Sequence, residues 1–296
     1  MKAFITNTGI FFLKLIAALP FGIIYFLSDI LFVVVYYLAE YRKKVVYRNL
    51  EKSFPGKTQN EQRQIARRFY RHFCDLTLET VKLNKMTEQE MKKRMKFHNH
   101  ELISQFTDAG RSVTVLAMHH NNWEWGTFLQ SFYKSKVLAV YKPLHNRHFD
   151  RYINANRARF GAEMIKNSQV LKRVLIAEKR QEPVVIWLAA DQTPPFFHTS
   201  WFRFLNQEAM FYPGPAFIAK RFNTPLIFQK IEKTKRGYYT SSLELLVENP
   251  AEMEENEIIK LYIQRMEEII REYPEYYLWS HKRWKHKRPE GIALNE

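Results

Sequence analysis

Hydrophobic side chains dominate the first part of the chain, and the polar residues that interrupt them decide how this part is interpreted. Residues 9–39 are mainly Phe, Leu, Ile, Val and Tyr, interrupted by Lys14, Pro20, Ser28 and Asp29. About 20 apolar residues are needed to cross the hydrocarbon of a bilayer, and a carboxylate inside such a stretch is costly. The segment is predicted to lie in or on a bilayer, either as a single crossing or as a shallow helical hairpin bent near Pro20.

Basic residues follow this apolar segment at Arg42, Lys43, Lys44 and Arg48. Lys and Arg beside a membrane segment mark its cytoplasmic side, so the rest of the chain is expected there. A cleaved signal peptide is the alternative, but the apolar run is too long and no convincing small-residue cleavage site follows it. We predict a membrane anchor over residues 1–48 and one folded domain over residues 49–296.

Helical spacing and short β-branched runs alternate in the rest of the chain. Thr58 is expected to cap a basic amphipathic helix running to about Leu83, and a second helix is expected from Glu88 to about Lys96. Further strands are expected over residues 113–118, 137–140, 184–188, 225–228 and 239–247, and further helices over residues 123–133, 150–160, 170–179, 214–222 and 254–273. This alternation predicts an α/β fold: a single mixed, mostly parallel sheet flanked by helices, with an antiparallel edge pair late in the chain.

Composition and charge narrow the class of protein. The chain has 296 residues, 46% hydrophobic and 26% charged, with 9 Gly and 12 Pro, which indicates a folded protein with little disorder. The single cysteine, Cys74, excludes an intrachain disulfide and a cysteine-based metal site. A net charge of +16 favours an acidic partner such as nucleic acid, anionic lipid or an acidic carrier protein. The sequence contains no nucleic-acid-binding motif, so nucleic acid is not expected as the partner.

His119 stands where the predicted strand over residues 113–118 ends, and Glu124 follows five residues later. Residues five apart point to opposite faces of a strand and lie roughly 140° apart on a helix, so these two side chains meet only if the chain turns between them. Asn121 and Asn122 suit such a turn, because Asn tolerates left-handed backbone and caps helix starts. Glu124 would then lie in the first turn of the next helix, where the helix dipole favours an anion.

The context of His119 separates it from a chance match. A second histidine-to-acid pair with the same spacing, His145 and Asp150, has polar neighbours and is interpreted as a solvated loop leading into a helix. His119 instead follows an apolar strand, and ligands of open α/β sheets gather beyond the carboxyl ends of their strands. The competing interpretation is a hydrogen-bonded interior histidine.

Five motifs in register give the whole chain a resemblance to a known family. They are His119-His120-Asn121-Asn122-Trp123-Glu124, Tyr141-Lys142-Pro143 leading to Arg157-Ala158-Arg159-Phe160-Gly161, Asp191-Gln192, Gly214-Pro215-Ala216, and Tyr277-Leu278-Trp279-Ser280-His281-Lys282-Arg283-Trp284. With them the chain resembles the late lipid A biosynthesis acyltransferases of the lysophospholipid acyltransferase superfamily. Two departures are Asn121, where the family has Gly, and Asn206, where a Phe-Phe-Gly triplet usually ends.

The resemblance implies a glycerolipid acyltransferase-like fold in which residues 49–296 form the catalytic domain. It also implies transfer of a fatty acyl chain from a thioester, usually on acyl carrier protein, to a hydroxyl of a lipid A precursor at the cytoplasmic face of the inner membrane. No cofactor and no metal are expected. An alcohol is a weak nucleophile, so His119 is expected to act as general base, with Glu124 holding the other ring nitrogen.

Further side chains are expected to contact substrate. Arg157 is predicted to bind phosphate or the developing oxyanion, with an exposed helix arginine as the alternative. Asp191, at the same sheet edge as His119, is predicted to orient a substrate hydroxyl or a loop, or to cap a turn, and Asn122 and Gln192 are further candidates for substrate binding. Aromatic residues that either line an acyl tunnel or pack as plain core are Phe196, Phe197, Trp201, Phe202 and Phe204.

Two alternative functions stay open at this stage. Within the enzyme class, the acceptor can be another membrane lipid, such as a phospholipid, an amino-acid lipid or a glycosylated phosphoinositide, because a fold does not select the acceptor. From another class, a non-catalytic basic membrane-binding protein would explain the charge and the hydrophobic N-terminus. It would leave the strand-turn-helix arrangement of His119 and Glu124 without a role.

Overall fold

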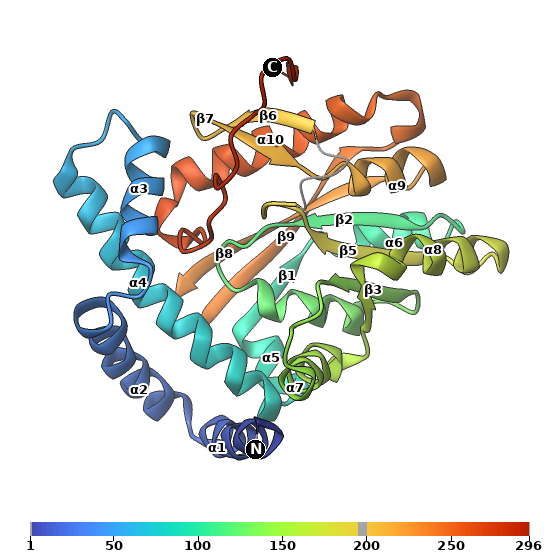
Figure 1. Ribbon diagram of the computed structural model, residues 1–296. Helices are drawn as coiled ribbons and strands as arrows, with labels where there is room; N and C mark the ends of the chain where they lie inside the picture. The colour runs from blue at the N-terminus through green and yellow to red at the C-terminus, as the bar shows by residue number, and fades with distance from the viewer. Residues whose placement is uncertain (1, 195–199, 296) are drawn as a thin grey trace.

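A seven-stranded sheet forms the centre of the molecule, in the order β1-β9-β8-β2-β5-β3-β4 (Figure 1). The computed structural model of the protein describes residues 2–194 and 200–295, with side chains from Ile5 onward. The strands of this sheet are β1 Met95–His98, β2 Val113–Ala117, β3 Lys136–Tyr141, β4 Glu163–Lys166, β5 Val184–Ala189, β8 Leu226–Lys235 and β9 Tyr238–Val247. A small second sheet contains β6 Ser200–Phe204, β7 Gln207–Phe211 and β10 Leu294–Asn295.

The predicted mostly parallel α/β sheet is confirmed, with one difference at its edge. All neighbouring strands are parallel except β8 and β9, the antiparallel pair expected late in the chain. This pair is not at the edge, because β1 adds to β9 in parallel. The predicted helix from Glu88 to about Lys96 therefore ends early, at Arg94, and the chain continues directly into β1.

Helices cover both faces of the sheet (Figure 1). The α-helices are α1 Lys2–Ala18, α2 Phe21–Val33, α3 Lys43–Ser53, α4 Gln59–Lys82, α5 Glu88–Arg94, α6 Glu101–Thr107, α7 Arg147–Arg157, α8 Val170–Lys179, α9 Gly214–Phe222 and α10 Glu255–Glu272. Shorter 3-10 or π segments are η1 Val34–Leu38, η2 Leu83–Lys85, η3 Trp123–Phe132, η4 Ala158–Phe160, η5 Asn167–Gln169, η6 Pro250–Glu252 and η7 Pro274–Tyr276.

Alternate residues of the central strands face two separate cores, as the period of two in a strand requires. Leu116 of β2 and Ile186 of β5 pack in a core shared with α8, α9 and α10. Val115 and Val185, one residue earlier in each strand, pack in a second core with Ile103 of α6 and with η3. Because β2 and β5 are covered on both sides, the ends of these two strands are held rigidly.

Of the N-terminal helices, α2 runs beside the long helix α4, and α1 contacts α4, α7 and η2 (Figure 1). Helix α4 begins at the predicted cap, where the Thr58 side chain accepts from the Glu61 amide and the Glu61 carboxylate accepts from the Thr58 amide at 2.7 Å. Helices α1 and α2 are separated by a break at Leu19 and Pro20, where the sequence predicted a bend. Residues Phe21–Leu38 are long and apolar enough to cross a membrane, with a mean hydropathy of 2.1. The predicted boundary between residues 48 and 49 lies inside α3.

Candidate active site

The neighbouring strands β2 and β5 bring His119 and Asp191 together. Their register pairs Ala117 with Ala189, and each of the two polar residues lies two positions beyond its strand. Because both strands point the same way, their carboxyl ends meet at one edge of the sheet. The Nδ1 atom of His119 lies 2.7 Å from Oδ1 of Asp191, within hydrogen-bond distance.

This contact corrects the predicted pairing of His119 with Glu124. The carboxylate of Glu124 does not hold the Nδ1 atom of His119. It accepts instead from Arg157, whose Nε lies 2.8 Å from Oε2 and whose Nη2 lies 2.6 Å from Oε1. The predicted turn does form, with Asn121 in left-handed backbone at a φ of 55°, but it leads Glu124 to the guanidinium at the end of α7. The hydrogen-bond partner of the His119 Nδ1 atom is Asp191.

Electrostatics supports an ionised Asp191 beside His119. The Asp191 side chain is almost completely buried. Burial alone would raise the pKa of this carboxyl, but the charge and hydrogen bond of His119 outweigh burial, and the pKa lies below its usual value. An ionised carboxylate only accepts hydrogen bonds, so in a neutral His119 ring it fixes the proton on Nδ1 and leaves the lone pair on Nε2.

The pair of Glu124 and Arg157 forms a fixed charged group next to His119. Burial opposes both charges, yet their mutual attraction prevails, lowering the pKa of Glu124 and raising that of Arg157. The two parallel N–H···O bonds fix the plane of the guanidinium. Arg157 is therefore not the exposed helix arginine of the alternative interpretation, because it is paired with Glu124. About a quarter of its side chain is exposed.

The next histidine in the chain, His120, is held differently. It is 2% exposed, its Nε2 lies 3.0 Å from the carbonyl oxygen of Tyr273, and its Nδ1 accepts from Asn121 Nδ2 at 3.1 Å. Burial lowers the pKa of His120 to about 4, so it stays neutral near pH 7. Both of its ring nitrogens are engaged, so His120 is a hydrogen-bonded interior histidine, whereas the His119 side chain is 19% exposed.

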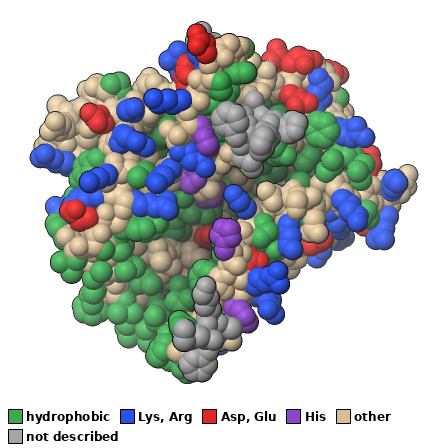
Figure 2. Space-filling view, in the orientation of Figure 1, with side chains coloured by type: hydrophobic (Ala, Val, Ile, Leu, Met, Phe, Trp, Pro, Cys, Tyr) green, Lys and Arg blue, Asp and Glu red, His purple; other side chains and the backbone are tan. Residues whose placement is uncertain are grey.

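A cavity of about 490 Å³ opens at this edge of the sheet. Figure 2 shows the surface hollowed near its centre, with Lys and Arg side chains around the hollow. Four of the predicted site residues line the cavity, namely His119, Glu124, Arg157 and Gln192. The others lining it are Trp123, Thr127, Val140, Tyr141, Lys142, Pro143, Leu144, His145, Met164, Trp187 and Ala189. Within residues 2–194 and 200–295, no cluster of three His, Cys, Asp or Glu side chains could hold a metal ion.

Comparison with known proteins decides the family. Residues 1–286 match the family described as bacterial lipid A biosynthesis acyltransferase. The chain belongs to this family. It is 24% identical to a lipid A biosynthesis lauroyltransferase of Escherichia coli (strain K12) over 293 residues, covering 98% of this chain and 94% of the relative. A palmitoleoyltransferase of the same strain and a lipid A biosynthesis acyltransferase of Shigella flexneri are each 23% identical over the same coverage. The protein is an acyltransferase.

Asn122 of the acyltransferase is engaged inside the protein and does not line the cavity. It is completely buried, its side-chain oxygen accepts from the Trp125 amide at 3.2 Å, and its Nδ2 donates to Glu79 at 2.7 Å. As a helix cap it matches the sequence interpretation of the turn. As a substrate-binding residue it does not, because both ends of its amide are already used inside the protein.

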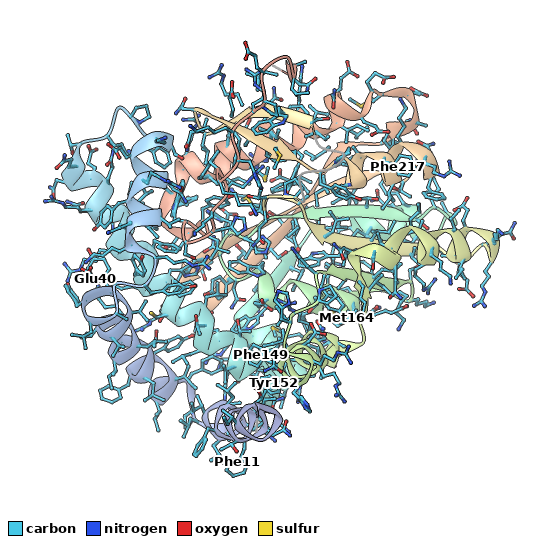
Figure 3. All side chains as sticks on the ribbon, viewed as in Figure 1. Phe11, Glu40, Phe149, Tyr152, Met164 and Phe217 are labelled. Carbon is cyan, nitrogen blue, oxygen red and sulfur yellow. The ribbon has the colours of Figure 1, made fainter. Side chains whose placement is uncertain are left out.

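The predicted acyl-pocket residues Phe202 and Phe204 do not line the cavity. Both are buried in the larger core, where Phe204 stacks on Trp284 with ring centroids 5.9 Å apart, and neither lines the cavity. Trp201 is buried as well, and Phe196 and Phe197 lie outside the described residues. Apolar walls come instead from four residues on the sheet, Val140, Met164, Trp187 and Ala189, of which Met164 is labelled in Figure 3.

The sequence analysis did not predict the contact between residues 276–278 and the loop over residues 118–122, which we call the histidine loop. The amide of Leu278 donates to the carbonyl of His119 at 3.0 Å, and the amide of Asn121 donates to the carbonyl of Tyr276 at 3.1 Å. These bonds join a loop after β2 to residues more than 150 positions later. The motif beginning at Tyr277 was the signal, but its spacing alone does not show which loop it contacts.

Glu79, also missed, is a buried carboxylate on α4 that supports the same loop. It accepts from the hydroxyls of Tyr25 at 2.9 Å and Tyr239 at 2.7 Å and from the amide of Asn122 at 2.7 Å. Burial raises the pKa of this carboxyl. The sequence does contain a signal for it. Glu79 lies three residues after Leu76, on the apolar side of the predicted helix, where a carboxylate is unusual unless it is paired.

Replacing Glu79 with Ala is expected to destabilise the acyltransferase. Two buried donors, Asn122 and Tyr239, and the partly buried Tyr25 would lose their acceptor, and each unsatisfied buried group costs about 1–3 kcal/mol. We expect the free energy of unfolding to fall by about 2–5 kcal/mol, measured by denaturant unfolding of the detergent-solubilised chain. Glu51→Ala, at an exposed position of α3, is the matched control. Equal losses in the two variants would contradict a supporting role for Glu79.

Proposed function

We propose that this acyltransferase transfers a fatty acyl chain from an acyl thioester to a hydroxyl of a lipid A precursor at the cytoplasmic face of the inner membrane. His119 acts as general base and Asp191 orients it. The observation that carries the proposal is the 2.7 Å contact between these two side chains at the rim of the cavity. Membership of the lipid A acyltransferase family supports the acceptor.

The reaction needs one base and one orienting acid. The free Nε2 of His119 takes the proton of the acceptor hydroxyl as its oxygen attacks the thioester carbonyl carbon. The resulting imidazolium is stabilised by the ionised Asp191 on the opposite ring nitrogen. When the carbon–sulfur bond breaks, the same proton passes from Nε2 to the departing sulfur. A new ester and a free thiol result, and the protein ends in its starting protonation state.

Arg157 is suited to the negative charge of this reaction. Its guanidinium lines the cavity close to His119, and Glu124 holds it in one plane through two of its N–H groups. The remaining N–H groups can donate to the oxyanion of the tetrahedral intermediate or to a phosphate of the acceptor. A fixed donor at a developing oxyanion is worth about 10²–10³-fold in rate. In this proposal Glu124 serves catalysis by positioning Arg157.

The net charge of the chain supports acyl carrier protein as the donor, and the cavity walls indicate where its acyl chain lies. Acyl carrier protein is acidic, and this chain has a net charge of +16, with Lys and Arg side chains around the hollow in Figure 2. The chain of the donor lies against the apolar residues Val140, Met164 and Trp187. Two relatives are named for lauroyl and palmitoleoyl transfer, which supports an acyl chain of the medium to long class.

Mass spectrometry of lipids from cells with and without the gene tests the proposed function. We expect lipid A from the deletion strain to lack one acyl chain, and the mass difference gives the chain length. Restoring the gene should restore the chain, whereas a gene with His119→Ala should not. Unchanged lipid A together with loss of another acylated membrane lipid would contradict the proposed acceptor and keep the acyl-transfer chemistry.

A further inference from the structure

Helix α2, the segment that is apolar enough to cross a membrane, is paired with α4 along its whole length (Figure 1). The two helices run antiparallel, and polar, cation–aromatic or aromatic contacts occur at nearly every turn. In order they are Phe21 with Lys82, Tyr25 with Glu79, Ser28 with Asp75, Phe32 with Arg71, and Tyr36 of η1 with Tyr70. Lys82 also donates to the carbonyls of Ala17 and Leu19 at the end of α1, at 2.9 and 2.7 Å.

Asp29, the charged residue in the middle of the apolar segment, takes part in the same contact between α2 and the rest of the protein. Arg236, in the turn between β8 and β9, donates to Asp29 and to Asp75, each at 2.7 Å. Asp75 accepts in addition from Ser28 at 2.8 Å. The residue that interrupts the apolar run is therefore neutralised by the catalytic domain, at the surface of the protein.

This arrangement is incompatible with a crossing by α2. If α2 entered the hydrocarbon in its observed place, α4 would have to follow with Arg67, Arg68, Arg71 and Lys82. A charged residue near the centre of a crossing helix is strongly unfavourable. If α2 left α4, then Asp29 would enter the bilayer without Arg236, and Ser28 and Tyr25 would lose their buried partners.

The opposite side of these helices is apolar and uncovered. Its residues recur at helical spacing on α1, α2 and η1 and are between 41% and 74% exposed. They are Ile5, Phe11, Phe12, Leu15, Ile23, Phe26, Ile30, Val33, Val34, Tyr37 and Leu38. Figure 2 shows a continuous hydrophobic area over α1 and α2, and Figure 3 shows Phe11 pointing away from the rest of the molecule. We call this surface the apolar platform; an exposed patch of this kind marks an interaction site.

We propose that the apolar platform lies in the plane of one anionic membrane leaflet, so that α1, α2 and η1 rest on the bilayer without crossing it. Exposed cations at its borders, Lys14 on α1 and Arg42 and Lys44 just after η1, match anionic headgroups. The platform also adjoins the cavity, because Thr6 of α1 accepts from Asn146 at the start of α7, next to the lining residues Leu144 and His145. The inference deepens the proposed function, since a lipid acceptor can then enter the cavity from the leaflet on which the enzyme rests.

Depth-dependent fluorescence quenching of the full-length chain tests the platform. Ile23→Cys, Ile30→Cys and Leu38→Cys place a fluorophore at the start, middle and end of the apolar segment, and the wild type, with its only thiol buried, is the blank. Each variant is reconstituted in phosphatidylethanolamine and phosphatidylglycerol vesicles that carry a nitroxide at either a shallow or a deep acyl carbon. We expect stronger quenching by the shallow nitroxide at all three positions. Gly56→Cys, where a side chain meets nothing within 4 Å, should not be quenched.

Each other result overturns the proposal. Stronger quenching by the deep nitroxide at Ile30→Cys than at the two ends would show a crossing helix. Absence of quenching at all three positions would show a platform covered by protein, such as a second copy of the chain. Removing phosphatidylglycerol should weaken vesicle binding at least about tenfold, given roughly 1 kcal/mol per basic residue near an anionic surface, and unchanged binding would exclude anionic lipid. Acyl transfer by the same preparations is measured separately, so failure of the proposed function is distinguishable.

Discussion

His119→Ala is expected to lower kcat for acyl transfer by about 10²–10⁴-fold, because proton transfer by a positioned base contributes that much. The variant removes the free Nε2 at the rim of the cavity and leaves the sheet intact, since His119 lies beyond the end of β2. The measurement is initial-rate kinetics with an acyl thioester and a lipid A precursor in mixed micelles. Residual activity above background would come from binding and from oxyanion stabilisation.

His98→Ala is the matched control, because His98 is exposed on the edge strand β1. Its kcat should equal that of the wild type. Unfolding curves and vesicle binding of both variants should also match the wild type. A well-folded His119→Ala protein with normal kcat would remove His119 from the mechanism and, with it, the proposed role of Asp191.

Asp191→Asn is expected to lower kcat by about 10²–10⁴-fold as well, with a small change in KM. The amide is neutral, so it cannot stabilise the imidazolium, and its NH₂ group can impose the wrong tautomer on His119. Glu124→Gln is expected to act differently. It loosens the bidentate contact with Arg157, so KM should rise if Arg157 binds phosphate, and kcat should fall about 10²–10³-fold if Arg157 serves the oxyanion.

The loss of kcat separates the two carboxylates. We expect a larger loss for Asp191→Asn, whose side chain contacts His119 directly, than for Glu124→Gln, which acts through Arg157. A larger loss of kcat in Glu124→Gln would reverse the two roles.

The sequence predicted a contact between His119 and Glu124 that the structure does not show, and the reason is physical. His119 and Glu124 are five residues apart, so a local motif suggests contact between them, and the turn at Asn121 does bring both to one cavity. The true partner of His119 is 72 positions away. Finding it requires the register of β2 on β5, in which Ala117 pairs with Ala189. Apolar runs predict that two strands exist, but they do not give their alignment.

The surroundings of buried side chains were harder to predict from the sequence than the bounds of helices and strands. The long helix α4 was predicted from its cap and spacing, and α8 and α9 were predicted with their observed bounds. Phe202 and Phe204 were not placed, because an aromatic side chain fills a core or a tunnel with the same sequence signal. Asn122 suited both a cap and a ligand contact, and only its buried bond to Glu79 separates the two.

The ion pairs of Arg236 with Asp29 and Asp75 have a practical consequence for producing this protein. Membrane enzymes are often shortened to a soluble fragment by deleting the hydrophobic leader. Here such a truncation would remove Tyr25, Ser28 and Asp29, uncover the side of α4 that they cover, and leave Glu79 with one fewer donor next to the histidine loop. The leader is a structural part of the folded enzyme, and expression designs should retain it.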